Sequence, residues 1–113
     1  MGQEVAKRFT AFGMKVVGYD IRVFESSCFD RIKLIETFGA DVGSFDVIVV
    51  TAPLTEQTFH LISKDMLRRL KRDAVLVNIA RGALVDEEAL GEELAERPDV
   101  YAALDVFEQE PLP

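Results

Sequence analysis

The sequence predicts an α/β protein with a doubly wound, mainly parallel sheet. Three short, strongly apolar runs support this prediction: "DVIVVTAP" (46–53), "AVLVNIA" (74–80) and "VYAALDVF" (100–107). Amphipathic segments with helical spacing separate them. Buried strands that alternate with helices are joined by crossovers, which gives an open sheet covered on both faces. No repeat or linker interrupts the chain, so we expect one domain over residues 1–113.

The N-terminal segment is expected to form a helix followed by a strand. Apolar residues recur at helical spacing in residues 3–12, and Gly13 is a stop signal. The following "MKVVGYD" is a short strand that ends on Asp20. Further along, "KDMLRRLKRD" (64–73) and "DEEALGEELAER" (86–97) are expected to be helices.

The stretch from Ile21 to Asp46 is the least clearly patterned part of the chain. Ser26 and Ser27 suggest a helix start near "CFDRI", because serine often caps helices. "KLIET" could be a brief strand, and "ADVGSF" a short turn or helix.

The composition is that of one small globular domain. The chain has 113 residues, of which 49% are hydrophobic and 29% are charged. The net charge of −7 argues against a nucleic-acid partner. No apolar run approaches the roughly 20 residues of a membrane span, so no membrane association is expected. The single cysteine, Cys28, fits a reducing cytoplasm and is more simply a packed residue than a catalytic thiol.

Polar and charged residues follow the predicted strands. In open α/β sheets ligands bind beyond the carboxyl ends of the strands. Those ends carry Asp20, Thr51-Ala52-Pro53, Asn78-Ile79-Ala80-Arg81 and the run from Asp105 to Glu110. This pattern suggests a site, although charged residues also occur where strands simply reach the surface.

Four motifs carry a resemblance to a known family. "MGQEVAKRFTAFGMKVVGYD", "TAPLTEQTFHLI", "VNIARGALVDEEAL" and "AALDVFEQEP" resemble the nucleotide-binding domain of the D-isomer-specific 2-hydroxyacid dehydrogenases. The resemblance is weakest between Ile21 and Phe45. It implies a Rossmann-like fold, NAD as cofactor, a small 2-hydroxy or 2-oxo acid as substrate, and a homodimer in the full-length form.

The resemblance also implies that parts of the family pattern are missing. The family's first strand is central in the sheet, between the strands that match "KVVGYD" and "DVIVV", and it leads into a Gly-x-Gly-x-x-Gly loop. Here Met1-Gly2 matches only the last two positions of that motif. The chain also stops at Pro113, before the segment that bears the family's catalytic histidine. We therefore expect an internal piece of a dehydrogenase, a partial NAD-binding domain without the substrate domain.

Several residues gain cofactor roles from the resemblance. Asp20 would accept hydrogen bonds from the adenosine ribose hydroxyls and disfavour a 2′-phosphate, although Arg22 nearby could meet one. A strand-end aspartate can also be merely solvated. The helix start at Met1 and Gly2 would face the pyrophosphate. The backbone at Ala52 would pass beside the adenine or ribose part of the cofactor.

Arg81 is the residue to which the resemblance gives the clearest catalytic role. It would bind the substrate carboxylate with two parallel hydrogen bonds and polarise the reacting carbonyl. The alternative is a structural salt bridge with Asp86 or Glu87. Ile79 and Ala80 would pack against the nicotinamide, and Gly82 would let the backbone turn tightly beside Arg81.

The segment after the last strand would complete the chemistry. By resemblance, Asp105 holds the nicotinamide carboxamide, and Glu110 is the acid that pairs with the catalytic histidine. Glu108, two residues away, is the natural misassignment. His60 more simply caps or covers a helix than replaces the missing histidine. No metal site is expected.

These roles favour an NAD-dependent oxidoreductase that interconverts a D-2-hydroxy acid and its 2-oxo acid. Arg81 and Glu110 are the candidate catalytic residues, and this chain alone would be inactive. Two alternatives stay open. One is a non-catalytic NAD(H)-sensing protein like the corepressors that share this domain, and the other is a truncated gene product without activity.

Overall fold

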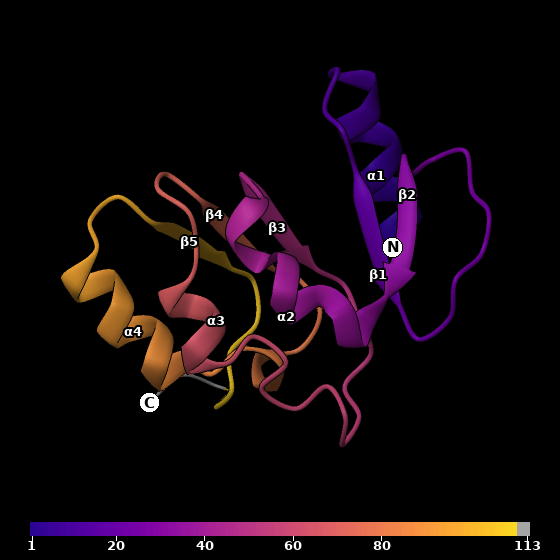
Figure 1. Ribbon diagram of the computed structural model, residues 1–113. Coiled ribbons are helices and arrows are strands. Elements are labelled where there is room, and N and C mark those ends of the chain that lie inside the picture. The colour runs from indigo at the N-terminus through magenta and orange to yellow at the C-terminus, as the bar shows by residue number, and fades with distance from the viewer. Residues whose placement is uncertain (111–113) are drawn as a thin grey trace. The chain divides into compact units, whose positions relative to one another are not determined.

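Parallel strands form two separate sheets, which belong to different units of the structure (Figure 1). The computed structural model describes residues 1–110. These residues divide into a unit from Met1 to Ala40 and a unit that begins at Asp41. Each unit has its own parallel sheet.

The first unit is a helix followed by two parallel strands. Helix α1 (Gly2–Ala11) buries Ala6 and ends before Gly13, whose φ of +86° is a conformation that favours glycine. The predicted helix and its stop are therefore confirmed. Strand β1 (Val17–Asp20) pairs with β2 (Arg31–Leu34), with Asp20 opposite Leu34. On the exposed face of α1, a hydrogen bond from Arg8 lowers the pKa of Glu4.

The second unit contains a three-stranded sheet in the order β3-β4-β5, with β3 (Val47–Val50), β4 (Val75–Asn78) and β5 (Tyr101–Leu104). Helices α3 (Lys64–Arg68) and α4 (Glu87–Glu96) connect these strands and pack side by side (Figure 1). Crossovers between parallel strands that step in one direction place their helices on one face. The strands and helices predicted for this unit are confirmed, each shorter than its apolar run.

The core of the second unit comes from the inward positions of its strands and helices. Alternate residues of β3 and β4 are buried, and Leu76 is completely covered. The other fully buried large side chains of this unit are Ile62, Leu67, Leu84, Val42, Val85 and Asn78. Asn78 is the one polar side chain in this set, and it lies at the end of β4.

The prediction of a helix near "CFDRI" is wrong. The Ser26 hydroxyl accepts a hydrogen bond from the Cys28 amide, which closes a local turn and does not cap a helix. The next residues form β2 instead. A 3-10 turn η1 (Ile35–Thr37), helix α2 (Phe38–Asp41) and a second 3-10 turn η2 (Val42–Ser44) follow, so the short helix expected in "ADVGSF" is confirmed.

Strands β1 and β3 each have one unpaired edge. Among the described residues, β1 pairs only with β2 and β3 pairs only with β4. These are the two strands that the sequence analysis expects to flank the family's first strand. The sheet of each unit thus ends, on one side, at a strand with an open edge.

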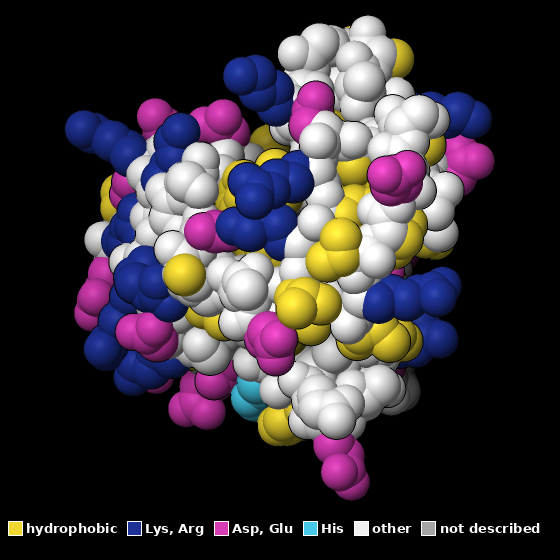
Figure 2. Space-filling view, turned by 45° about the vertical axis from the view of Figure 1, so that its right-hand side comes forward, with side chains coloured by type: hydrophobic (Ala, Val, Ile, Leu, Met, Phe, Trp, Pro, Cys, Tyr) yellow, Lys and Arg dark blue, Asp and Glu magenta, His cyan; other side chains and the backbone are white. Residues whose placement is uncertain are grey.

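The surface mixes charged and apolar side chains. On the face shown in Figure 2, acidic and basic side chains alternate with scattered hydrophobic ones. Exposed large apolar residues include Met1, Phe12, Ile21, Val23, Phe59 and Tyr101. In the described part of the chain, no helix is long and apolar enough to cross a membrane.

Candidate functional site

The turn after β4 is held by a buried asparagine. Only 1% of the Asn78 surface is exposed. Its side-chain nitrogen donates to the Arg81 carbonyl at 2.9 Å, and its side-chain oxygen accepts from the Ala80 amide at 3.1 Å. These two bonds fix the path of residues 78–81. Sequence reasoning assigned Asn78 no role, although an amide that ends an otherwise apolar run was a signal for it.

Arg81 is exposed, and its guanidinium bonds to a backbone carbonyl. Its backbone is extended, with φ −143° and ψ 142°, and its guanidinium donates to the Ala80 carbonyl at 2.7 Å. Within the described residues, no acidic side chain forms an ion pair with Arg81. The Asp86 carboxylate instead lies by His60 and the Ala89 amide, and the Glu87 carboxylate accepts from the Glu108 amide. The expected alternative, a structural salt bridge to one of these two residues, is absent from this arrangement.

Gly82 makes close contact with the segment that follows β5. A β-carbon placed on Gly82 would overlap the carbonyl group of Phe107 and the amide nitrogen of Glu108. The expected tight turn is confirmed, since Gly82 begins the 3-10 turn η3 (Gly82–Leu84) and the Leu84 amide donates to the Arg81 carbonyl at 3.2 Å. Gly82 has no positive φ, so glycine is needed here because two backbones meet and not for its conformational freedom.

The residues after β5 are thereby placed beside the Arg81 turn. The Asp105 amide donates to the Asn78 carbonyl at 3.0 Å, which continues the pairing of β4 and β5. Asp105 itself is exposed. The Glu110 carboxylate accepts from the Phe107 amide at 3.1 Å. The structure thus brings together the segments that carry Arg81, Asp105 and Glu110, at the carboxyl ends of two neighbouring strands.

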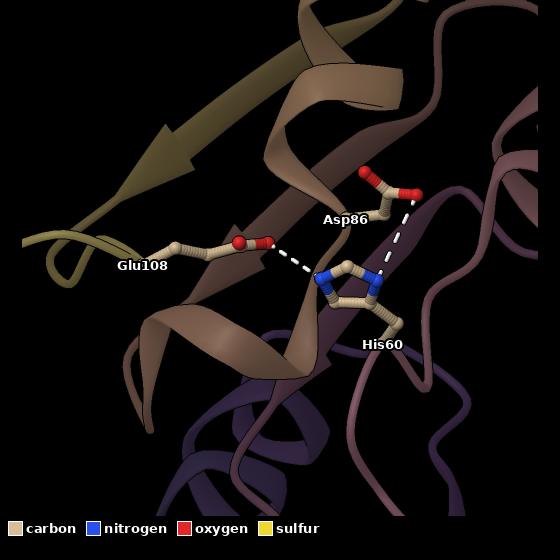
Figure 3. A group of neighbouring side chains, drawn as sticks. All are labelled: His60, Asp86 and Glu108. Carbon is tan, nitrogen blue, oxygen red and sulfur yellow. Dashed lines mark hydrogen bonds and ion pairs between the residues drawn. The ribbon is translucent and has the colours of Figure 1, made fainter.

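A histidine lies between two carboxylates near this junction (Figure 3). The His60 Nε2 atom is 2.8 Å from Glu108, and its Nδ1 atom is 3.8 Å from Asp86. Asp86 is the N-cap of α4, and its other oxygen accepts from the Ala89 amide. His60 was expected to cap or cover a helix. Its ring lies beside the N-cap of α4, which agrees with that expectation only in part. The sequence analysis did not find the pair formed by His60 and Glu108.

In the first unit, Asp20 is half-buried at the end of β1. Its Oδ1 atom accepts from the Ile21 amide at 2.6 Å. The described residues give Oδ2 no partner, so this oxygen is available to an external donor. Arg22 is exposed. Helix α1 begins at Gly2, and Met1 precedes it without a side-chain cap.

A compact turn follows β3. Ala52 is half-buried there, and Thr58 is 5% exposed. The Thr58 hydroxyl accepts from the Thr55 amide and donates to the Pro53 carbonyl, both at 2.7 Å. Thr58 therefore closes the turn and leaves Ala52 at the strand end.

Comparison with known proteins identifies the family. A family model for the NAD binding domain of D-isomer specific 2-hydroxyacid dehydrogenases matches residues 1–113. The chain belongs to this family. D-3-phosphoglycerate dehydrogenase of Methanocaldococcus jannaschii is 40% identical over 112 residues, which are 98% of this chain and 21% of that protein. Glyoxylate reductase of Korarchaeum cryptofilum is 41% identical over 115 residues, which are 100% of this chain and 34% of that protein.

Solved structures of family members share the fold. A D-isomer specific 2-hydroxyacid dehydrogenase family protein from Aeromonas salmonicida has a TM-score of 0.91 and 36% identity, over 99% of this chain and 36% of its own. The NAD complex of Staphylococcus aureus formate dehydrogenase has a TM-score of 0.86 and 37% identity, over 99% of this chain and 33% of its own. The NADPH complex of a Xanthobacter autotrophicus member has a TM-score of 0.86 and 33% identity, over 96% of this chain and 45% of its own.

These matches confirm the predicted Rossmann-like fold and a nicotinamide dinucleotide as the family's cofactor. The chain spans 21% and 34% of the two curated relatives named above, so it corresponds to their NAD-binding part.

Proposed function

We propose that this chain is the cofactor-binding part of an NAD-dependent oxidoreductase that interconverts a D-2-hydroxy acid and its 2-oxo acid. One observation carries the proposal: Gly82 meets the Phe107–Glu108 peptide, which joins the turn of Arg81 to the segment of Asp105 and Glu110. Family membership supports the reaction class. The relatives named above are dehydrogenases or a reductase, which favours an enzyme over a corepressor-like protein.

Arg81 binds the substrate in this proposal. Its exposed guanidinium has no carboxylate partner among the described residues, and the Asn78 bonds hold its backbone. A guanidinium can grip the carboxylate of a 2-oxo acid through two parallel hydrogen bonds and fix its plane. Its charge also stabilises the negative oxygen that develops as the ketone is reduced.

Residues around β4 and β5 hold the nicotinamide end of the cofactor. Asp105 accepts from the carboxamide, and the half-buried Ile79 and Ala80 supply an apolar contact. The bound NAD(H) supplies the hydride acceptor or donor. Glu110 orients a histidine of the full-length protein, which moves the proton.

Residues of the first unit hold the ribose and pyrophosphate parts of the cofactor in this proposal. The Oδ2 atom of Asp20 accepts from a ribose hydroxyl, and its charge disfavours a 2′-phosphate. The free amides at the start of α1, next to Met1 and Gly2, face the pyrophosphate. Ala52 contacts the adenosine side.

The test is an assay of a full-length protein that carries this chain. NADH oxidation would be followed with glyoxylate, hydroxypyruvate, pyruvate and larger 2-oxo acids, and with simple ketones that lack the carboxylate. We expect turnover only with 2-oxo acids, and the reverse reaction only with the D-isomers. Equal turnover of ketones without a carboxylate, or none with any 2-oxo acid, would contradict the proposal.

The full-length protein is proposed to be a cytoplasmic homodimer without a nucleic-acid partner. The single cysteine fits a reducing compartment, and the net charge of −7 disfavours binding to phosphates. Light scattering of the purified protein would give its mass. A monomeric mass at micromolar concentration would contradict the dimer.

A further inference from the structure

His60 occupies a constrained position in the loop between β3 and α3. It is one of two non-glycine residues in the described chain with positive φ, at +50°. Its amide donates to the Ala83 carbonyl at 2.8 Å, and its ring stacks on Phe59 with centroids 4.1 Å apart. Positive φ is uncommon for a residue other than glycine, although histidine adopts it more often than most, and here the surrounding contacts stabilise it. These contacts hold the His60 ring so that its nitrogens face Glu108 and Asp86.

The two ring nitrogens of His60 face different carboxylates (Figure 3). Nε2 is within hydrogen-bond distance of Glu108, whereas Nδ1 is 3.8 Å from Asp86. These nitrogens lie on different edges of the imidazole ring. Each carboxylate therefore faces its own ring nitrogen, and the imidazole ring bridges the two acids. One ligand atom of each of the three residues lies within 4.8 Å of the others, so binding of a cation is the competing use of this group.

Glu108 also links His60 to the start of α4. The Oε1 atom that faces His60 also accepts from the Glu87 amide at 3.1 Å. In return, the Glu108 amide donates to the Glu87 carboxylate. Glu108 is thus fixed by a reciprocal pair of bonds at the start of α4 and by one bond to His60. Three segments that are distant in the sequence meet at one side chain.

We propose that His60 is a positioning residue for the reaction, acting through Glu108. The Phe107–Glu108 peptide lies on Gly82, next to Arg81, and the Phe107 amide binds Glu110. A displacement of Glu108 would therefore also displace the peptide that contacts Gly82 beside Arg81, and the Phe107 amide that binds Glu110. This inference rests on the proposed function. It adds a role for a side chain whose ring bonds to Glu108 and does not itself touch the substrate.

The experiment compares His60→Ala, His60→Gln and Glu108→Gln in a full-length protein that carries this chain. We expect His60→Ala to lower kcat by about 10- to 100-fold, since small displacements of catalytic groups have effects of that size. The KM for NADH should change less than about twofold, because no cofactor contact is removed. Gln keeps an N–H donor of similar reach, so His60→Gln should recover most of the lost kcat.

Three controls separate this role from general loss of structure. Glu88→Gln removes an exposed carboxylate of α4 that has no ion pair in the described chain, and it should leave kcat unchanged. The melting temperatures should show that His60→Ala stays folded at the assay temperature. The double variant His60→Ala with Glu108→Gln should be no slower than the worse single variant, since both substitutions remove the same hydrogen bond.

The outcomes of these experiments are distinct. A wild-type protein without activity contradicts the proposed function itself. An active wild type whose His60→Ala variant keeps kcat contradicts the positioning role alone. Equal losses in His60→Ala and His60→Gln, or additive losses in the double variant, would also overturn it. EDTA and then Zn²⁺ are added to the wild type and to His60→Ala. If EDTA lowers kcat and Zn²⁺ restores it in the wild type but not in His60→Ala, these residues form a cation site, and the positioning role is overturned.

Discussion

Gly82 lies so close to Phe107 that no side chain can stand between the two backbones. The contact is made by main-chain atoms on both sides, so neither residue can relax by changing a rotamer. It joins the turn after β4 to the segment after β5, and it makes the position of Arg81 depend on the path of residues 105–110.

Gly82→Ala should destabilise the fold, whereas Gly91→Ala should not. The new methyl at Gly82 would force backbone apart, which we expect to cost about 3 kcal/mol or more. Gly91 lies in α4, where an added β-carbon would have nothing within 4 Å, so alanine should stabilise the helix by up to about 1 kcal/mol. Thermal unfolding of both variants in the full-length protein measures this. Equal melting temperatures would contradict the close contact.

Asn78→Ala should weaken the turn that carries Arg81. It leaves the Ala80 amide without its partner and removes one of the two hydrogen bonds to the Arg81 carbonyl, which we expect to cost about 1–3 kcal/mol. Ser44→Ala is a matched control, because it removes one exposed hydrogen bond to Asp41 and should change stability by about 0.5 kcal/mol or less. Urea titrations would compare the two. Similar midpoints would show that Asn78 does not support the turn.

Arg81→Lys should reduce turnover by about 10²-fold or more, because lysine keeps the charge but loses the planar pair of donors. NADH binding should stay nearly intact. Arg72→Lys, at another exposed arginine, serves as the control and should have wild-type kcat. Steady-state assays with the best 2-oxo acid decide the matter. If Arg81→Lys turns over like wild type, Arg81 does not act on the substrate.

Asp20→Ala should narrow a preference for NAD over NADP. Removing the carboxylate deletes an acceptor for the ribose hydroxyls and the repulsion toward a 2′-phosphate. Asp30→Ala, at a carboxylate that instead accepts from the Val16 amide, controls for loss of local structure. Fluorescence titrations with NADH and NADPH give the ratio of affinities. Equal affinities in the unmodified protein would exclude this role for Asp20.

The 113-residue chain alone should be marginally stable and bind NAD weakly or not at all. The open edges of β1 and β3 leave backbone groups unpaired. Each such group costs about 1–3 kcal/mol when buried, against a net stability of about 5–15 kcal/mol for a domain. Calorimetry and NADH oxidation assays check this. A cooperative melt of a monomer, with micromolar NAD binding, would show that the edges matter little.

The sequence predicts most of the fold because its buried strands are continuous apolar runs. Strands β3 and β4 lie within such runs, and the helices between them follow from spacing and from caps such as Asp86. Strand β2 was predicted only in part: the brief strand expected in "KLIET" shares Lys33 and Leu34 with it, whereas Ile35–Thr37 form η1. Its pattern is weak because only its central two residues are partly covered and both ends are exposed. A serine turn before it imitated a helix start.

The candidate site was predictable only where it follows directly from strand ends. Arg81 and Asp105 each stand where an apolar run stops, and a parallel sheet brings such ends to one edge. His60 and Glu108 are 48 residues apart, and no local pattern shows that they meet. The contact of Gly82 with Phe107 is also tertiary, so the sequence predicted the turn at Gly82 but not the close approach of a second backbone.

Strand β4 is the only strand in the described chain with a partner on both sides. Its amides should therefore exchange with solvent deuterons only when the whole second unit opens, while those of β1 and β2 exchange through smaller, more frequent openings. Arg81 follows this strand by three residues and is tied to it through Asn78. The cation proposed to grip the substrate is thus attached to the slowest-opening part of the molecule, and it would keep its place while the surrounding loops fluctuate.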